Sequence, residues 1–267
     1  MSAERIQNHI LLTATIVPGA GVNVTRLADP AVRRAQYEAA LRFYLSRPGG
    51  MIDGILFCEN SDADLSSLEV IARDENPAGI PVRFFSQKAD CPAEYGKGHS
   101  ELQLMDRAWE AEIRGKAESS RWWKITGRLE IANIETLIAT APKDFEIYLD
   151  LRMVPGVLRF FGTDRWADTR IIAFTPEGYR KHLLGMKRVV GTPDHAVMAN
   201  HHVPELSLFP YLLASWEAGE GVAPRFTRQP VMIGVGAESL KQYNDLNART
   251  KNLVRSAARR LAPSLWL

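Results

Sequence analysis

Hydrophobic residues in the first half of the chain form short continuous runs, separated by segments with the spacing of helices. The first run, residues 9–17, is apolar enough for a central strand, because strands buried on both faces of a sheet read as unbroken hydrophobic runs. Similar runs recur along the chain. The predicted strands are 9–17, 52–58, 81–86, 122–125, 145–153 and 171–174.

Helix signals lie between these runs. Asp29 suits an N-cap and Pro30 suits the first helical position, so a helix is predicted from there. Residues 99–117 and 133–141 are predicted as further helices. Later helices are predicted to open at Thr175-Pro176-Glu177, at Thr192-Pro193-Asp194-His195 and, for the terminal helix, after Gly234-Val235-Gly236.

The order of these elements is βαβαβ with a further αβ unit, followed by a mixed half. Alternation of this kind predicts an α/β fold with a mostly parallel sheet flanked by helices and joined by right-handed crossovers. A Rossmann dehydrogenase is disfavoured, because Pro18-Gly19-Ala20-Gly21 does not supply the G-x-G-x-x-G helix start.

The stretch around the fourth predicted strand indicates a ligand edge. Thr126-Gly127-Arg128 follows residues 122–125 with a hydroxyl group, a flexible position and a fixed positive charge. Ligands of open α/β sheets gather outside the carboxyl ends of the strands, so Lys124, Thr126 and Arg128 are predicted to lie at that edge. The competing interpretation is an ordinary strand followed by a solvated turn.

Two other segments carry candidate chemistry. Glu59-Asn60-Ser61-Asp62 follows the second predicted strand and could bind ribose or base hydroxyls, or could instead start a helix capped by Ser61 or Asp62. Gly96-Lys97-Gly98 would let the backbone approach a ligand while Lys97 meets a phosphate. Its spacing is not that of a Walker motif.

Composition separates the chain into a body and a tail. Of 267 residues, 46% are hydrophobic and 24% charged, which is enough apolar material for one α/β domain over residues 1–240. Residues 241–267 hold six basic residues against Asp245 alone and predict a basic amphipathic helix. Such a helix suits an anionic membrane surface, or docks on the body with a solvated basic face. Nucleic acid is not an expected partner, since the body carries no matching basic stripe.

The expected location is cytoplasmic. Cys58 and Cys91 fit neither a metal spacing nor a disulfide framework, the first residues are polar, and no apolar run approaches the ~20 residues that span a bilayer.

Taken in order, these motifs resemble a group of bacterial proteins of lipopolysaccharide and capsule biosynthesis, related to nucleotide-sugar glycosyltransferases of the GT-A type. The resemblance covers roughly residues 9–245. It implies a GT-A-like, Rossmann-related fold and sugar transfer from a nucleotide-sugar donor to a lipid-linked or oligosaccharide acceptor, with possible peripheral attachment at the inner face of the cytoplasmic membrane. It rests on Cys58-Glu59-Asn60-Ser61, Gly96-Lys97-Gly98, Lys124-Ile125-Thr126-Gly127-Arg128, Asp168-Thr169-Arg170, Asp194-His195 and Gly234-Val235-Gly236.

One departure from the family pattern shapes the predicted chemistry. Classical GT-A enzymes hold a divalent metal with an Asp-x-Asp at the strand end that here reads Thr126-Gly127-Arg128. Fixed cations can neutralise a departing diphosphate in place of a metal, so no metal is predicted to be required, although Mg²⁺ or Mn²⁺ stays possible. The cations predicted for this role are Lys97, Lys124, Arg128 and Arg170, with Lys124 the least secure because strand alternation could point it away.

The resemblance also suggests a base. Inverting GT-A enzymes use a carboxylate near the start of a late helix to deprotonate the acceptor hydroxyl, and Asp194 occupies the comparable place with His195 beside it. Asp194 could equally be only a helix cap, and His195 only a packed histidine. The full predicted donor-binding set is Thr13, Glu59, Asn60, Asp62, Lys97, Lys124, Thr126, Gly127, Arg128, Asp168 and Arg170.

Two alternatives to a glycosyltransferase stay open at this stage. A sugar nucleotidyltransferase shares the α/β architecture and the need for phosphate-binding cations. A non-catalytic glycosyltransferase-like scaffold of a polysaccharide assembly complex would keep the fold without the reaction.

Overall fold

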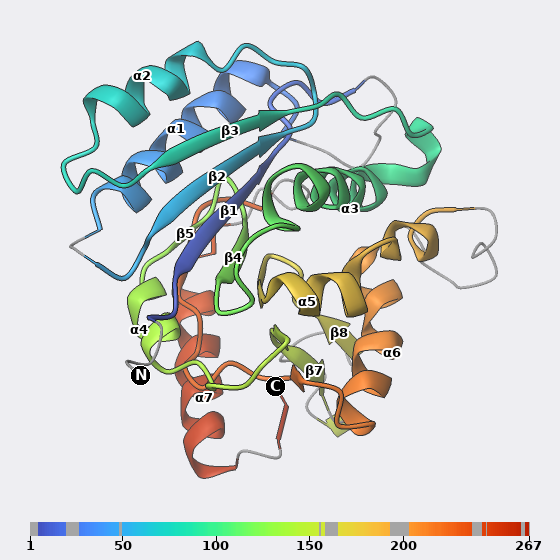
Figure 1. The fold of residues 1–267 in the computed structure, drawn as a ribbon. Helices are drawn as coiled ribbons and strands as arrows, with labels where there is room; N and C mark the ends of the chain where they lie inside the picture. Colours follow the sequence, from blue (N-terminus) through green and yellow to red (C-terminus); the bar gives the residue numbers. More distant parts are fainter. Residues whose placement is uncertain are drawn as a thin grey trace.

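A mostly parallel sheet of seven strands organises the molecule (Figure 1). The computed structural model describes residues 5–19, 27–47, 50–154, 156–157, 165–192, 203–236, 242–243, 245–262 and 265–266. Across the sheet the strand order is β10-β6-β9-β4-β1-β2-β3. The strands are β1 (Asn8–Ala14), β2 (Gly54–Glu59), β3 (Val82–Ser86), β4 (Arg121–Thr126), β6 (Ile147–Tyr148), β9 (Ile171–Phe174) and β10 (Val222–Ala223).

The pairing confirms the predicted α/β fold. β1 runs parallel to its neighbours β2 and β4, β2 runs parallel to β3, and β10 runs parallel to β6. Among the described strands of this sheet, β9 is the one that runs antiparallel to its neighbours, β4 and β6. The carboxyl ends of six strands and the amino end of β9 therefore share one edge, which we call the carboxyl edge.

The prediction of a single strand over residues 145–153 is wrong. The run 145–153 divides into β6, which joins the main sheet, and β7 (Leu151–Met153), which pairs with β8 (Arg165–Ala167) in a separate ribbon. Buried Asp150 lies between the two strands and accepts a hydrogen bond from the backbone N–H of Phe226. A further small ribbon joins β5 (Glu130–Ile131) to β11 (Met232–Ile233).

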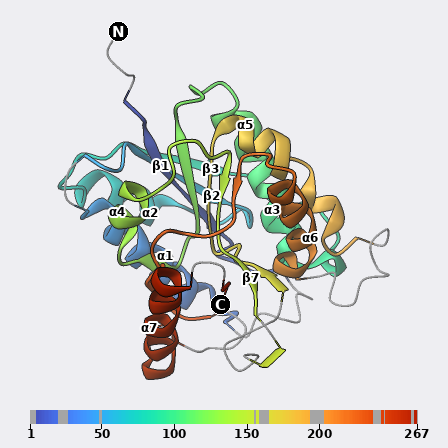
Figure 2. The same ribbon diagram turned by 90° about the horizontal axis from the view of Figure 1, so that it is seen from below.

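Helices cover both faces of the sheet. Figure 2 shows α1, α2, α4 and α7 on one side of the strands and α3, α5 and α6 on the other. Successive residues of β1 pack on opposite faces, Ile10 and Leu12 in one core and Leu11 in the other. The helices are α1 (Pro30–Leu45), α2 (Ser66–Asp74), α3 (Gly96–Ala108), α4 (Ile134–Ala139), α5 (Pro176–Gly178), α6 (Pro204–Glu217) and α7 (Leu246–Leu261).

Local sequence signals explain where several helices begin. The side chain of Asp29 accepts hydrogen bonds from the backbone N–H groups of Ala31 and Val32, and Thr175 accepts one from Gly178, as predicted. The predicted cap of the next helix is wrong. Neither Ser61 nor Asp62 caps α2, which begins only at Ser66.

Two more helix starts differ from the predictions. Gly96-Lys97-Gly98 forms the first turn of α3 rather than a loop before it, and α3 continues into a π-helical turn, Trp109–Ile113. The terminal helix begins at Leu246, ten residues after Gly236, because Asp245 supplies an N-cap through its bond to the N–H of Ala248. The helix predicted to open at Thr192-Pro193-Asp194-His195 lies outside the described residues.

No helix in the described part of the chain is both long enough and apolar enough to cross a membrane.

Candidate active site

Backbone hydrogen bonds join the strand ends at the centre of the carboxyl edge. The N–H of Gly127 donates to the carbonyl of Thr13 at 2.8 Å, and the N–H of Thr126 donates to the carbonyl of Arg170 at 2.9 Å. A Cβ atom at position 127 would lie 2.7 Å from that Thr13 oxygen, so glycine is needed for the close approach of two strands. Gly127 therefore positions the edge rather than leaving space for a ligand.

Lys124 lies beneath this edge and not on it. Its side chain is 1% exposed, and its Nζ is 2.8 Å from Oε1 of Glu101 and donates to the carbonyl of Thr169 at 2.6 Å. The hydroxyl of Thr13 donates to the same Glu101 oxygen at 2.6 Å. The predicted contact of Lys124 with the ligand is therefore corrected. Strand alternation directs Lys124 towards α3, where it and Thr13 hold Glu101 in place.

Glu59 and Asn60 also serve the framework. Glu59 is fully buried, and its carboxylate accepts hydrogen bonds from the N–H groups of Ile16 and Ala63 and from both the N–H and hydroxyl of Ser61. These donors occupy its oxygens, so we assign Glu59 to the scaffold instead of the predicted nucleoside contact.

Asn60 joins the segment after β1 to helix α3 through its side-chain amide. It accepts from the hydroxyl of Thr15 at 2.6 Å and donates to that of Ser100 at 2.9 Å. Asp62, in contrast, is exposed and has a φ of +59°, a left-handed conformation that costs energy in a residue other than glycine. Of the four predicted residues at this strand end, Asp62 is the one presented to solvent.

Three cations from different elements converge at the carboxyl edge, and we call them the donor-side cations. They are Lys97 in the first turn of α3, Arg128 after β4, and Arg33 in α1. Burial lowers the pKa of Lys97, and the charges of Arg128 and Arg33 lower it further, while Glu205 and Glu101 raise it. Burial likewise lowers the pKa of Arg128, with Arg33 adding to the effect. The charges are therefore close enough to repel one another.

The structure fixes two of these cations by hydrogen bonds. Arg33 donates through Nε to the carbonyl of Thr15 at 2.6 Å and through Nη2 to the hydroxyl of Tyr37 at 3.0 Å. Arg128 donates to the carbonyl of Val235. Cations held in advance suit a ligand whose negative charge grows during a reaction, because no reorganisation is then required.

Like Glu101, Glu205 in the first turn of α6 is a carboxylate whose charge acts on Lys97. Burial raises its pKa above the ordinary value, and the nearby charges of Asp168 and Glu101 raise it further, against a 3.1 Å hydrogen bond from the hydroxyl of Thr169. A carboxylate with a raised pKa is a better proton acceptor than an ordinary one. Helix α6 begins at Pro204, which packs on Gly98. A Cβ atom added to Gly98 would lie 2.7 Å from the proline ring.

Asp168 and Arg170 lie farther along the same edge, in a group with other arginines. Asp168 is 1% exposed and meets Arg152 at 2.6 Å and Arg170 at 2.5 Å. Burial alone would raise the pKa of Asp168, but Arg170 and Arg152 hold it well below its usual range. Asp168 thus orients the two arginines, and the predicted ligand contact of Arg170 stays a prediction.

Asp194 and His195, the predicted catalytic residues, lie outside the described residues. The described residues on either side both contact the start of α3. Before the gap, a Cβ at Gly191 would overlap the carbonyl oxygen of Tyr95. After it, Pro204 packs on Gly98.

Among the described residues, no group of three or more His, Cys, Asp or Glu side chains is arranged to hold a metal ion.

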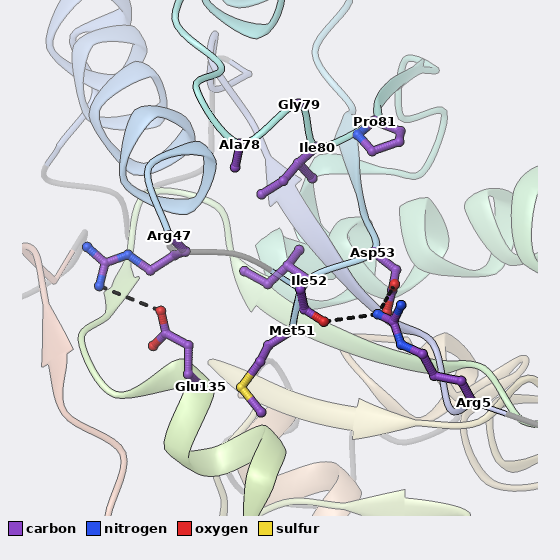
Figure 3. Close-up of a pocket in the computed structure, with 11 residues that line it drawn as sticks. Arg5, Arg47, Met51, Ile52, Asp53, Ala78, Gly79, Ile80, Pro81 and Glu135 are labelled. Carbon is purple, nitrogen blue, oxygen red and sulfur yellow. Dashed lines mark hydrogen bonds and ion pairs between the residues drawn. The ribbon is translucent and has the colours of Figure 1, made fainter.

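A cavity of about 240 Å³ lies at the opposite edge of the sheet (Figure 3). It is bordered by residues that precede β2 and β3, including Asp53 and Pro81. Both arginines that border it are already paired, Arg5 with Asp53 at 2.5 Å and Arg47 with Glu135 at 3.8 Å. Because ligands of this architecture bind at the carboxyl edge, we do not place the active site in this cavity.

Sequence reasoning missed three residues of the site, Arg33, Glu101 and Glu205. Arg33 lies on a helix that the sequence predicted only through its apolar residues. Glu101 lies in a segment where only Gly96-Lys97-Gly98 was recognised as candidate chemistry. Glu205 offered a usable signal, because it follows Pro204 in the first turn of a helix, where carboxylates are stabilising.

No protein-family model matches the chain, and neither does any curated protein. Solved structures of similar shape include an active-site mutant of LgtC, with 10% identity, a TM-score of 0.48 and coverage of 81% of this chain and 72% of that one. The inositol-1-phosphate CTP transferase of T. maritima has 11% identity, a TM-score of 0.47 and coverage of 96% and 98%. Mouse xyloside xylosyltransferase 1 has 12% identity, a TM-score of 0.42 and coverage of 82% and 85%. These similarities concern the fold alone.

Proposed function

We propose that the protein is a nucleotide-sugar-dependent glycosyltransferase. The observation that carries this proposal is the convergence of Lys97, Arg128 and Arg33 at the carboxyl edge of the sheet, beside the half-buried carboxylate of Glu205. Cations at this edge suit a diphosphate, and a carboxylate with a raised pKa suits a hydroxyl group that must lose its proton.

The proposed reaction divides the work between these groups. The bond between the anomeric carbon of the sugar and the diphosphate oxygen breaks, and the donor-side cations stabilise the negative charge left on the diphosphate. The acceptor oxygen forms the new bond to that carbon, and its proton passes to a carboxylate. Glu205 is the acceptor of that proton among the described residues, and Asp194, with His195, stays the sequence-based alternative.

The proposed setting follows from the resemblance of the motifs. We place the reaction in bacterial surface polysaccharide biosynthesis, with a lipid-linked or oligosaccharide acceptor at the cytoplasmic side of the membrane. Support for a membrane comes from α7, which has no buried residue and exposes Leu246, Leu253 and Leu261 by 81%, 72% and 86%.

Thermal stabilisation by candidate donors tests the proposal. UDP-, GDP- and CMP-sugars are compared with the corresponding nucleoside triphosphates in EDTA and again with Mg²⁺. A nucleotide-sugar at ~100 times its Kd adds about 2.7 kcal/mol to the free energy of unfolding, which is a clear shift in Tm. We expect one nucleotide-sugar to stabilise the protein even in EDTA, since fixed cations replace the metal.

Variants connect the expected shift to the site. Arg128→Ala and Lys97→Ala should remove most of the stabilisation and of the turnover, whereas Arg260→Ala on the exposed side of α7 should remove neither. Stabilisation by a triphosphate in place of any nucleotide-sugar would favour a nucleotidyltransferase. Full activity of both site variants would contradict the role of the donor-side cations.

A further inference from the structure

A path of polar contacts beneath the carboxyl edge joins α3 to the first turn of α6. It begins at Glu101, whose Oε1 accepts a hydrogen bond from the hydroxyl of Thr13 at 2.6 Å and lies 2.8 Å from Nζ of Lys124. The same Nζ donates to the backbone carbonyl of Thr169 at 2.6 Å. The hydroxyl of Thr169 donates to Oε1 of Glu205 at 3.1 Å. Lys124 is thus joined through one residue to the carboxylate that we propose as the base.

The turn that carries Thr169 is held from three sides. Thr169 is 7% exposed and lies between β8 and β9. Before it, the buried carboxylate of Asp168 accepts two hydrogen bonds from the side chain of Arg170. After it, the carbonyl of Arg170 accepts one from the N–H of Thr126. Lys124 supplies the third restraint at the carbonyl of Thr169 itself, and a fixed backbone limits the positions that the Thr169 hydroxyl can reach.

Stability alone does not account for a charged side chain at position 124. The side chain of Lys124 is 1% exposed, and a lysine loses favourable hydration when it is buried. Well-packed apolar side chains of similar volume are often as stable as a buried ion pair, or more stable. An apolar side chain could not donate a hydrogen bond to the carbonyl of Thr169, and this bond is what distinguishes the lysine.

The Thr169 hydroxyl also influences the charge of Glu205. Burial raises the pKa of Glu205, and the hydrogen bond from Thr169 opposes this rise, because it favours the ionised carboxylate. The charges of Asp168 and Glu101 raise the pKa of Glu205 as well, while the charge of Glu205 acts in turn on Lys97 of α3. The contact with Lys124 offsets the charge of Glu101.

We propose that Lys124 is a positioning residue, which acts through Thr169 to hold the carboxylate of Glu205 in the direction that proton acceptance requires. The inference rests on the proposed function, because it assigns a part of the same reaction. The path does not carry the proton itself, since its link between Lys124 and Thr169 is a backbone carbonyl, which serves only as an acceptor.

The first test changes only the hydroxyl of Thr169. Thr169→Val keeps the shape of the side chain, Thr169→Ser keeps the hydroxyl, and Thr136→Val, at an exposed position of α4, is the matched control. The pKa of Glu205 is measured without substrate by NMR of isotope-labelled glutamate carboxyls, with Glu205→Gln identifying the signal. Turnover is measured as hydrolysis of UDP-, GDP- and CMP-sugars, with water as the acceptor.

We expect a higher pKa of Glu205 in Thr169→Val, and a fall of kcat/KM that begins at a higher pH. At neutral pH kcat should be reduced by about tenfold or more, because a hydrogen bond to a charged group is lost. The KM for the nucleotide-sugar should be unchanged, since the hydroxyl faces the base and not the donor-side cations. Thr169→Ser and Thr136→Val should match the wild type.

The second test assigns the effect to Lys124. Lys124→Met and Glu101→Gln are combined, so that neither charge is left without its partner. This paired variant should lower kcat about as much as Thr169→Val does, and should lower it little further when Thr169→Val is already present, because both changes remove the same restraint. The Thr169 variants decide the proposal even if the paired variant does not fold.

Two results would overturn the proposal. Hydrolysis by Thr169→Val at the wild-type rate would show that the hydroxyl does not position the base. Equal losses of kcat from the paired variant with and without Thr169→Val would show that Lys124 does not act through Thr169. Failure of the wild type to hydrolyse any nucleotide-sugar, with the expected change in the pKa of Glu205 present, would instead remove the glycosyltransferase proposal and leave the path to Glu205 standing.

Discussion

At the scale of single residues, Glu205 decides how the proposed reaction depends on pH. Its pKa is raised by burial, so it is ionised only above a higher pH than an exposed glutamate. A base acts in its ionised form, and kcat/KM should therefore fall as the pH falls through this raised pKa. Glu205→Gln should remove this decrease of kcat/KM at low pH and should reduce turnover by about 10²–10⁴-fold.

Stability measurements separate this role from a structural one. A carboxyl whose pKa is raised by folding favours the folded state while protonated, and this contribution is lost as the pH rises through the folded pKa. At pH 7 the neutral Glu205→Gln should thus melt at or above the wild-type temperature. Glu217→Gln, at the exposed end of the same helix, is the control. Near-full turnover in Glu205→Gln would exclude it as the base and leave Asp194 to be tested by Asp194→Asn.

The residue scale also shows where sequence reasoning succeeded and failed. The edge position of Arg128 followed from the hydrophobic pattern alone, because the pattern located the strand before it. Lys124 belongs to the same motif but is buried under the edge, because it lies two residues inside the end of β4 and meets Glu101 of α3. The pairing of Lys124 with Glu101 across two elements has no local signal, and neither has the saturation of Glu59 by four donors.

At the scale of elements, α7 is attached to the body by a polar contact and not by an apolar face. Arg259 reaches inward to Asp150 and Gln229 with a side chain that is 4% exposed, whereas no apolar residue of the helix is buried. Removal of one partner of a buried ion pair costs about 3–5 kcal/mol, because the other charge is left uncompensated. Arg259→Met should lower the free energy of unfolding by this amount in chemical denaturation, whereas exposed Arg260→Met should change it little.

The prediction depends on the pairing of Arg259 with Asp150, because replacement of Arg259 leaves the buried carboxylate of Asp150 without its ion-pair partner. Equal stability of Arg259→Met and the wild type would show that Asp150 does not hold the helix.

Elements were more predictable than their boundaries. The alternation of strands and helices, the caps at Asp29 and Thr175 and the strand 171–174 followed from local patterns. The run 145–153 was divided by tertiary structure, because buried Asp150 interrupts it to meet Arg259, a residue 109 positions away. The first turn of α3 was missed, since glycines disfavour helix interiors. Here Gly96 has a φ of +80° and Gly98 admits Pro204.

At the scale of the whole molecule, α7 connects the carboxyl edge to the outer surface. With 100° per residue, Leu246, Leu253 and Leu261 fall on one face of the helix and Arg255 and Arg259 on the opposite face. The inner face supplies Arg259, which pairs with Asp150, and the outer face presents exposed leucines beside Arg249 and Arg260. An anionic membrane against those leucines would lie roughly one helix diameter, about 10–12 Å, from Arg259.

This arrangement predicts membrane binding that can be removed without unfolding. Leu253→Glu and Leu261→Glu should abolish sedimentation with vesicles that contain anionic lipid, because each change removes apolar contact and adds repulsion. Their Tm should stay near that of the wild type, since both side chains are largely exposed. Val157→Glu, at a position 87% exposed elsewhere on the molecule, should bind normally. Failure of the wild-type protein to sediment with vesicles that contain anionic lipid would contradict the proposal.

The order in which the charged residues occur along the chain limits how the molecule can be divided. The donor-side cations and Glu205 span residues 33–205, and the ion pairs of Asp150 and Asp168 span residues 150–259, so the two stretches overlap. No single cut of the chain separates them, and neither could be exchanged between proteins as an independent module. The terminal helix, although an appendage by composition, is bound into this arrangement by Arg259. Recombination at this edge would thus have to preserve both groups at once.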